Sequence, residues 1–139
     1  MKVFLDTNVI IDFYSQREEH FQRAAIIMDL AVRGQIELIV SGTTFVNAFF
    51  LLKDFYDRSE LYEAMSKLAS KCHISPINSE MIVNGLTMRS PDFEDAVQLL
   101  SAKSAQADVF ITRDKHFKHF EGNIMSPKLF LEFYFTNKI

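Results

Sequence analysis

The chain has 139 residues, a formal net charge of −3 and a pI near 5.8. Its length suits a single domain over residues 1–139 that buries about two thirds of its unfolded surface. The acidic balance excludes strong, sequence-independent attraction to nucleic acid, and the single cysteine excludes an intramolecular disulfide. Because no apolar window approaches a membrane span, we expect a soluble, cytoplasmic protein.

The first predicted strand covers residues 2–6 and ends in a carboxylate, Asp6. Its continuous apolar run is typical of a strand covered on both faces. A helix is expected from near Val9, and a second from about Glu19 to Arg33, followed by Gly34 where a left-handed cap is favoured. The apolar residues at helical spacing in this second helix are Phe21, Ala24, Ala25, Met28, Ala31 and Val32.

The second predicted strand, over residues 36–40, leads into a helix after Ser41. The stretch FVNAFFLLKDFY at 45–56 is apolar on more than one face, which is typical of a deeply buried helix or of one that meets another chain. The run LFLEFYF at 129–135 leaves the same two alternatives open.

Further along, Ser59 is the expected cap of a helix through Lys71 with Leu61, Met65 and Leu68 facing inward. Cys72 is expected to act as a small buried hydrophobe at the entrance of a weak strand at 73–77. The remaining elements are a helix opened by SPDFEDAVQLL at 90–100, a strand at 108–112, a weak strand at 123–125 and a helix capped by Ser126-Pro127.

This alternation of strands and helices predicts an α/β fold with a mostly parallel sheet wrapped by helices. Ligands of such folds bind beyond the carboxyl ends of the strands. The polar residues at those ends are Asp6, Ser41, Thr112, Arg113 and Asp114. They are therefore the first candidates for a functional site.

The carboxylates near these ends suit two roles. Helix capping explains Asp6, Asp92 or Asp114 when each is taken alone. If Asp6, Asp95 and Asp114 converge, however, each pair about 4 Å apart costs roughly 4 kcal/mol at an effective dielectric near 20, which caps of about 1 kcal/mol do not offset. Such a cluster requires a proton or a cation, and oxygen ligands favour Mg²⁺ or Mn²⁺ over zinc.

Four segments resemble one known family when taken in this order: FLDTNVIID at 4–12, SGTTFVNAFFLL at 41–52, DFEDAVQLLSAKSAQADVFITRDKHF at 92–117 and SPKLFLEF at 126–133. Together they look like a PIN domain, a fold of metal-dependent ribonucleases that includes the toxins of VapBC toxin–antitoxin pairs. The resemblance implies a three-layer α/β/α fold with a parallel sheet of about five strands. It also implies an acidic site that binds one or two Mg²⁺ or Mn²⁺ ions and hydrolyses RNA.

By this resemblance the metal-binding and catalytic aspartates are Asp6, Asp95 and Asp114. The family's glutamate on the helix after the second strand is replaced by Asn47, which supplies no charge and cannot act as a base. We therefore expect one firmly held ion with room for a weaker second one. Residues expected to support the ligands, or to serve only as local caps, are Thr7, Asn8, Ser41, Asp92, Glu94 and Thr112. Arg113, Lys115 and Lys118 form either a rim for RNA phosphates or an ordinary solvated surface.

The function predicted from the sequence is therefore that of a metal-dependent endoribonuclease, the toxin of a pair, with an RNA substrate, a cognate antitoxin and a second copy of itself as partners. The alternative is a degenerate PIN domain that binds RNA or a protein without cleavage, because of Asn47. Phosphoryl transfer through an aspartyl phosphate is disfavoured, since Asn8 stands where a second carboxylate is wanted.

Overall fold

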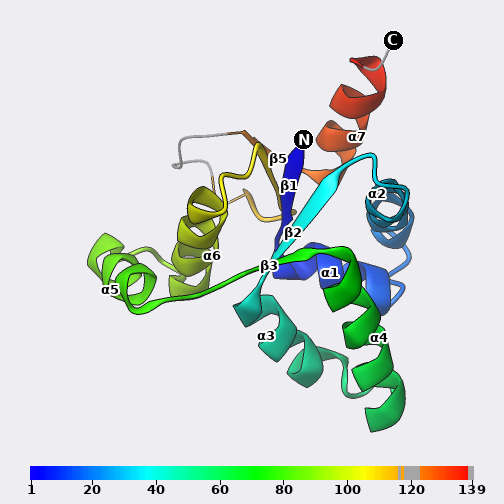
Figure 1. Ribbon diagram of the computed structural model, residues 1–139, viewed down its shortest axis with the longest axis horizontal. Coiled ribbons are helices and arrows are strands. Elements are labelled where there is room, and N and C mark those ends of the chain that lie inside the picture. The colour runs from blue at the N-terminus through cyan, green and yellow to red at the C-terminus, as the bar shows by residue number, and fades with distance from the viewer. Residues whose placement is uncertain (116, 118–122, 138–139) are drawn as a thin grey trace.

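The computed structural model describes residues 1–115, 117 and 123–137, and Figure 1 shows the arrangement of their helices and strands. Strands and helices alternate along most of this part of the chain, as the sequence predicts. In chain order the elements are β1 Lys2–Leu5, α1 Thr7–Tyr14, α2 Phe21–Val32, β2 Glu37–Ser41, α3 Gly42–Leu52, α4 Arg58–Lys71, β3 His73–Ser75, α5 Ser79–Met88, α6 Phe93–Ser104, β4 Val109–Ile111, β5 Ile124–Met125 and α7 Pro127–Thr136.

The sheet has five strands in the order β3-β2-β1-β4-β5, and every pair of neighbours is parallel. The chain first builds outward from β1 to β2 and β3, then crosses to the other side of β1 to add β4 and β5. The strand order therefore reverses between β1 and β4, and the carboxyl ends of these two strands are where a ligand site is expected.

Helices cover both faces of the sheet, which confirms the three-layer α/β/α arrangement (Figure 1). Side chains alternate along each strand, so Val3 and Leu5 of β1 enter one core while Phe4 between them enters the other. The larger core packs α1, α2, α3, α4 and α7 against the sheet. The smaller core contains Phe4, Ile39, Leu99, Ala102, Phe110 and Phe117, and α6 covers it.

Two predicted helix details are wrong. Asp57, not Ser59, caps α4: the Asp57 Oδ1 accepts from the Glu60 amide at 2.8 Å while the Glu60 Oε1 accepts from the Asp57 amide at 3.4 Å. This reciprocal capping box satisfies two amides, which Ser59 inside the helix cannot do. Of the apolar residues predicted at helical spacing in α2, Ala24 and Met28 are buried, but Val32 is 58% exposed. Ile27 and Leu30, which were not predicted, are buried as well.

Other predictions about packing are confirmed. Gly34 has φ +70°, the left-handed conformation that ends α2. The residues Leu61, Met65 and Leu68 of α4 are buried. Cys72 is half-buried against the larger core, and burial raises the pKa of its thiol to about 11. The helix α5, whose start is capped by the Asn78 side chain, was not predicted.

The apolar helix α3 combines the two roles that its sequence leaves open. Ala48 and Leu52 are fully buried, whereas Val46 and Phe50 are 73% and 69% exposed. In α7, Phe130 is likewise buried and its neighbour Leu129 is exposed. None of the helices in the described part of the chain is long and apolar enough to cross a membrane.

Candidate active site

Asp6 lies directly after β1, and its carboxylate accepts three hydrogen bonds. The Thr7 amide donates to Oδ1 at 2.7 Å, and the Thr112 hydroxyl and the Asn8 side-chain amide donate to Oδ2 at 2.7 and 3.1 Å. Asp6 therefore caps α1, as the capping alternative expects. It is also only 5% exposed and is bonded to the segment after β4, which capping alone does not require.

Burial and neighbouring negative charges oppose ionisation at this site. Burial raises the pKa of Asp6 to about 6, although hydrogen bonds from Thr112 and Thr7 lower it; the charges of Glu94 and Asp114 raise it further. Burial also raises the pKa of Asp95 to about 7, with contributions from Asp92, Asp6, Asp114 and Glu94. The two carboxyl groups thus lie in surroundings that a nearby cation would stabilise.

The predicted aspartates converge on one cleft of about 300 Å³. Asp6 comes from the end of β1, Asp114 from the segment after β4 and Asp95 from the first turn of α6. This acidic cleft is lined by Asp6, Thr7, Asn8, Ile11, Arg17, Leu51, Glu94, Asp95, Arg113 and Asp114.

Thr112 joins the two strand ends that carry Asp6 and Asp114. Its hydroxyl donates to Asp6 and accepts from the Asp114 amide at 2.9 Å. Asn8 adds a second link, because its Oδ1 accepts from the Arg113 amide at 3.4 Å. These contacts hold the β1 and β4 ends in a fixed relation.

Two predicted supporting residues act as helix caps. The buried Ser41 hydroxyl accepts from the Thr44 amide at 3.3 Å, and the exposed Asp92 accepts from the Glu94 amide at 3.0 Å. Neither is among the residues that line the acidic cleft. Asp92 nevertheless acts on the site through its charge, which raises the pKa of Asp95.

Asn47 lies on the side of α3 that faces the site. Thr44 and Leu51, three residues before it and four after it, share its helix face. Thr44 bonds to Thr7 and Leu51 lines the acidic cleft, whereas the half-buried Asn47 is not among the lining residues. The helix α3 contains no Asp or Glu, so its carboxylate contribution to the cleft is missing.

A buried amide, Gln98, was missed by the sequence reasoning. Its Nε2 donates to the Thr7 and Thr44 hydroxyls at 2.7 and 3.0 Å, and Thr7 in turn donates to Glu94 at 3.3 Å. Gln98 is fully buried, and within the described residues its Oε1 has no hydrogen-bond partner. The signal available was a single amide in the otherwise apolar run AVQLL, one turn after Glu94.

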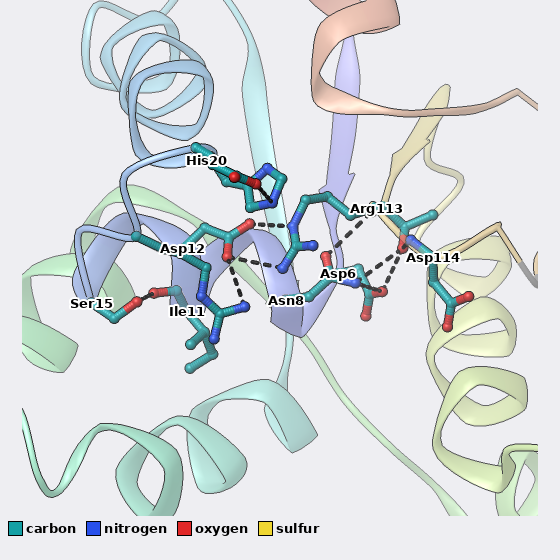
Figure 2. Close-up of polar contacts among 11 residues, drawn as sticks. Asp6, Asn8, Ile11, Asp12, Ser15, His20, Arg113 and Asp114 are labelled. Carbon is teal, nitrogen blue, oxygen red and sulfur yellow. Dashed lines mark hydrogen bonds and ion pairs between the residues drawn. The ribbon is translucent and has the colours of Figure 1, made fainter.

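A second missed residue is Asp12, a buried carboxylate that is 1% exposed. Arg113 binds both of its oxygens, with Nη2 3.0 Å from Oδ1, and Arg17 lies 3.8 Å away (Figure 2). The Arg113 guanidinium is thus held by Asp12 on one side while Arg113 also lines the acidic cleft. Of the other two predicted RNA-binding residues, Lys115 is exposed and Lys118 lies outside the described residues.

The donor set suits a hard cation. Within residues 1–115, 117 and 123–137, no three Asp, Glu, His or Cys side chains already stand close enough to form a ready-made metal-binding group. Magnesium, however, usually binds through one or two carboxylates and keeps several waters. A buried Asp6, with Asp95, Asp114 and Glu94 in the same cleft, fits this mode of binding.

Comparison with known proteins identifies a matching family and a named relative. A family profile described as "PIN domain" matches residues 2–116. The relative is Ribonuclease VapC1 of Aquifex aeolicus (strain VF5), which is 19% identical over 136 residues. The match covers 94% of this chain and 94% of the relative.

Solved structures with the same fold include a toxin–antitoxin complex from Klebsiella pneumoniae, with a TM-score of 0.68 and 20% identity, covering 90% of this chain and 97% of that one. A second is VapC20 from Mycobacterium tuberculosis, described as a Sarcin-Ricin loop cleaving toxin. Its TM-score is 0.65 at 13% identity, covering 83% of this chain and 92% of that one. At these identities the likeness establishes the α/β/α fold.

Proposed function

Because the chain belongs to the PIN domain family, we propose that it is a metal-dependent endoribonuclease and the toxin of a toxin–antitoxin pair. The observation that carries this proposal is the convergence of Asp6, Asp95, Asp114 and Glu94 on one cleft at the carboxyl edge of a parallel sheet. The name of the Aquifex ribonuclease supports the nuclease activity, and the Klebsiella complex supports the antitoxin partner.

In this proposal Asp6, Asp95 and Asp114 hold one Mg²⁺ or Mn²⁺ ion directly or through water. The ion supplies an acidified water and positive charge beside the scissile phosphate. Thr112 fixes the orientation of the Asp6 carboxylate at 2.7 Å, and its bond to the Asp114 amide positions the second ligand. The third proposed ligand, Asp95, comes from the first turn of α6.

The exposed apolar residues of α3 are the proposed surface for the antitoxin or for a second copy of the chain. Val46 and Phe50 of α3, and Phe55 just after the helix, are all at least 61% exposed. Apolar side chains gathered on one exposed helix face are typical of protein contact surfaces. RNA and a cognate antitoxin are cytoplasmic partners, so the proposed place of action is the cytoplasm.

The direct test of the proposed function is cleavage of RNA by the purified protein. We expect products in the presence of Mg²⁺ or Mn²⁺ and none in EDTA, as measured on labelled structured RNAs. RNA binding without cleavage under every divalent ion would instead favour the alternative of a degenerate PIN domain. The reason for this alternative is that Asn47 stands where the family has a glutamate, so the site has one carboxylate fewer.

Glu94→Gln tests whether α6 supplies the carboxylate that α3 lacks. The charge of Glu94 bears on Asp6, its Oε1 accepts from Thr7, and its side chain lines the cleft. We expect a loss of about 10- to 100-fold in cleavage rate, because the glutamine keeps the hydrogen bond but not the charge. Glu80→Gln, in the first turn of α5, is the matched control and should leave the rate unchanged. Equal rates for both variants would remove Glu94 from the mechanism.

A further inference from the structure

A second cavity, of about 250 Å³, lies on the other side of Arg113 from the acidic cleft. This basic cavity is lined by His20, Arg23, Arg113, Ser126, Pro127 and Lys128. Four of these six residues are basic, and no carboxylate is among the described residues that line it. In a chain whose net charge is −3, this concentration of basic side chains is exceptional.

The nearest negative charges leave the basic cavity open to an anion. Glu19 and Glu132 are exposed and lie 3.9 Å from His20 and 4.0 Å from Lys128, so solvent weakens both contacts. Asp12 is bound by Arg113. Within the described residues, Arg23 forms no ion pair, so its guanidinium can accept an anionic partner.

Two helices also begin at the basic cavity. His20 precedes α2, whose first turn receives no side-chain cap. Ser126 and Pro127 start α7, where the Ser126 hydroxyl already accepts from the Leu129 amide at 3.1 Å, so this helix contributes its dipole alone. Uncapped amides at the start of a helix and the helix dipole both favour a bound anion. The helix ends add to the four basic side chains, which are the main attraction.

Arg113 connects the basic cavity with the acidic cleft, because its side chain lines both (Figure 2). An anion in the basic cavity therefore lies one side chain away from Asp6 and Asp114. Consecutive phosphates of a nucleic acid strand supply such neighbouring negative charges. We propose that the basic cavity binds an RNA phosphate flanking the one that lies in the acidic cleft. This assignment rests on the proposed nuclease function.

The test measures RNA binding without cleavage. A fluorescein-labelled 12-nucleotide single-stranded RNA is titrated in EDTA at several NaCl concentrations, and anisotropy gives Kd for the wild type and for Arg23→Gln/Lys128→Gln. Both replaced residues are exposed, so the fold should survive. We expect a Kd at least tenfold higher for the double variant. The slope of log K against log[NaCl] should fall in magnitude by about 0.7, because the double variant loses one phosphate contact and each such contact to a single strand contributes about 0.7.

The matched control is Lys67→Gln/Lys103→Gln, which removes the same charge from two exposed lysines that line neither the acidic cleft nor the basic cavity. This variant should bind RNA like the wild type. Equal weakening by both variants would overturn the proposal, since it would show only an effect of net charge. An octaglutamate peptide is a second probe. The proposal would also be overturned if the double variant lost affinity for this peptide but bound RNA as the wild type does.

These outcomes are independent of the nuclease assay. A protein that cleaves RNA yet binds it equally well without Arg23 and Lys128 would retain its proposed function and lose this site. A protein that never cleaves RNA but loses binding in the double variant would keep the site and lose the nuclease function.

Discussion

Asp6→Asn is expected to abolish RNA cleavage and to stabilise the metal-free protein. The loss of rate should be about 10³-fold or more, the size of effect seen when a group that acts on charge at the reacting centre is removed. The gain in stability follows from burial, which raises the pKa of Asp6 from 3.8 to about 6 and so corresponds to about 3 kcal/mol of unfavourable free energy once the group is ionised. Asparagine loses one acceptor, at about 1 kcal/mol, so a net gain of about 2 kcal/mol is expected.

The stability difference between Asp6→Asn and the wild type should depend on pH. Below about pH 4 the carboxyl is protonated in the folded and unfolded states alike, so Asp6 costs the wild type nothing. Between about pH 3.8 and 6 the unfolded state has released this proton while the folded state keeps it, so the wild type loses stability over this range, and the loss is complete above about pH 6. Urea unfolding in EDTA should therefore show the advantage of Asp6→Asn at pH 8 but not at pH 4. A variant that is less stable than the wild type at pH 8 would contradict this account.

Metal binding supplies the control for this experiment. Mn²⁺ should raise the Tm of the wild type at pH 8, because an ion that binds only the folded state stabilises it. The same addition should leave the Tm of Asp6→Asn nearly unchanged. A similar Mn²⁺ effect on both proteins would show that Asp6 is not a principal ligand.

Arg113→Gln is expected to lower the free energy of unfolding by about 3 kcal/mol. The change leaves Asp12, which is 1% exposed, without its two-point partner, and removal of one member of a buried pair typically costs 3–5 kcal/mol. The lower end of this range is expected because Arg17 remains 3.8 Å from Asp12. Urea unfolding at neutral pH is the measurement.

The double variant Asp12→Asn/Arg113→Gln should recover most of this loss, since neither charge is then left buried alone. Arg33→Gln is the control: its bridge to Asp29 joins side chains that are 65% and 54% exposed, and its removal should cost at most about 1 kcal/mol. If the double variant were as unstable as Arg113→Gln, the cost would come from lost packing of the arginine and not from an isolated Asp12.

Much of the fold can be predicted from the sequence because the patterns that indicate strands and helices are local. Apolar runs at 2–6, 36–40 and 108–112 predict strands that the structure places at the centre of the sheet, with ends shifted by one residue. Polar residues after these strands mark the correct sheet edge, since parallel strands share one carboxyl edge. The roles of Asp6, Asp95 and Asp114 stay predictions, although the structure brings all three to one cleft.

The features that sequence reasoning missed depend on contacts between distant residues. Asp12 and Arg113 are 101 positions apart, and nothing near either residue indicates its partner. Gln98 is 54 positions from Thr44, and the two side chains meet only in the folded protein, where Gln98 is fully buried. The Asp57 cap of α4 was a local signal, but sequence reasoning assigned the cap to Ser59 and missed it.

The bond between Thr112 and Asp6 also sets the time at which the site becomes complete during protein synthesis. Asp6 leaves the ribosome early, but the hydroxyl that bonds to it follows 106 residues later. At a typical translation rate of 5–20 residues per second this delay is about 5–20 seconds. A nascent chain that stops before Val109 lacks β4 and, of the residues that line the acidic cleft, Arg113 and Asp114. The complete site therefore forms only after Thr112 and Asp114 have been synthesised.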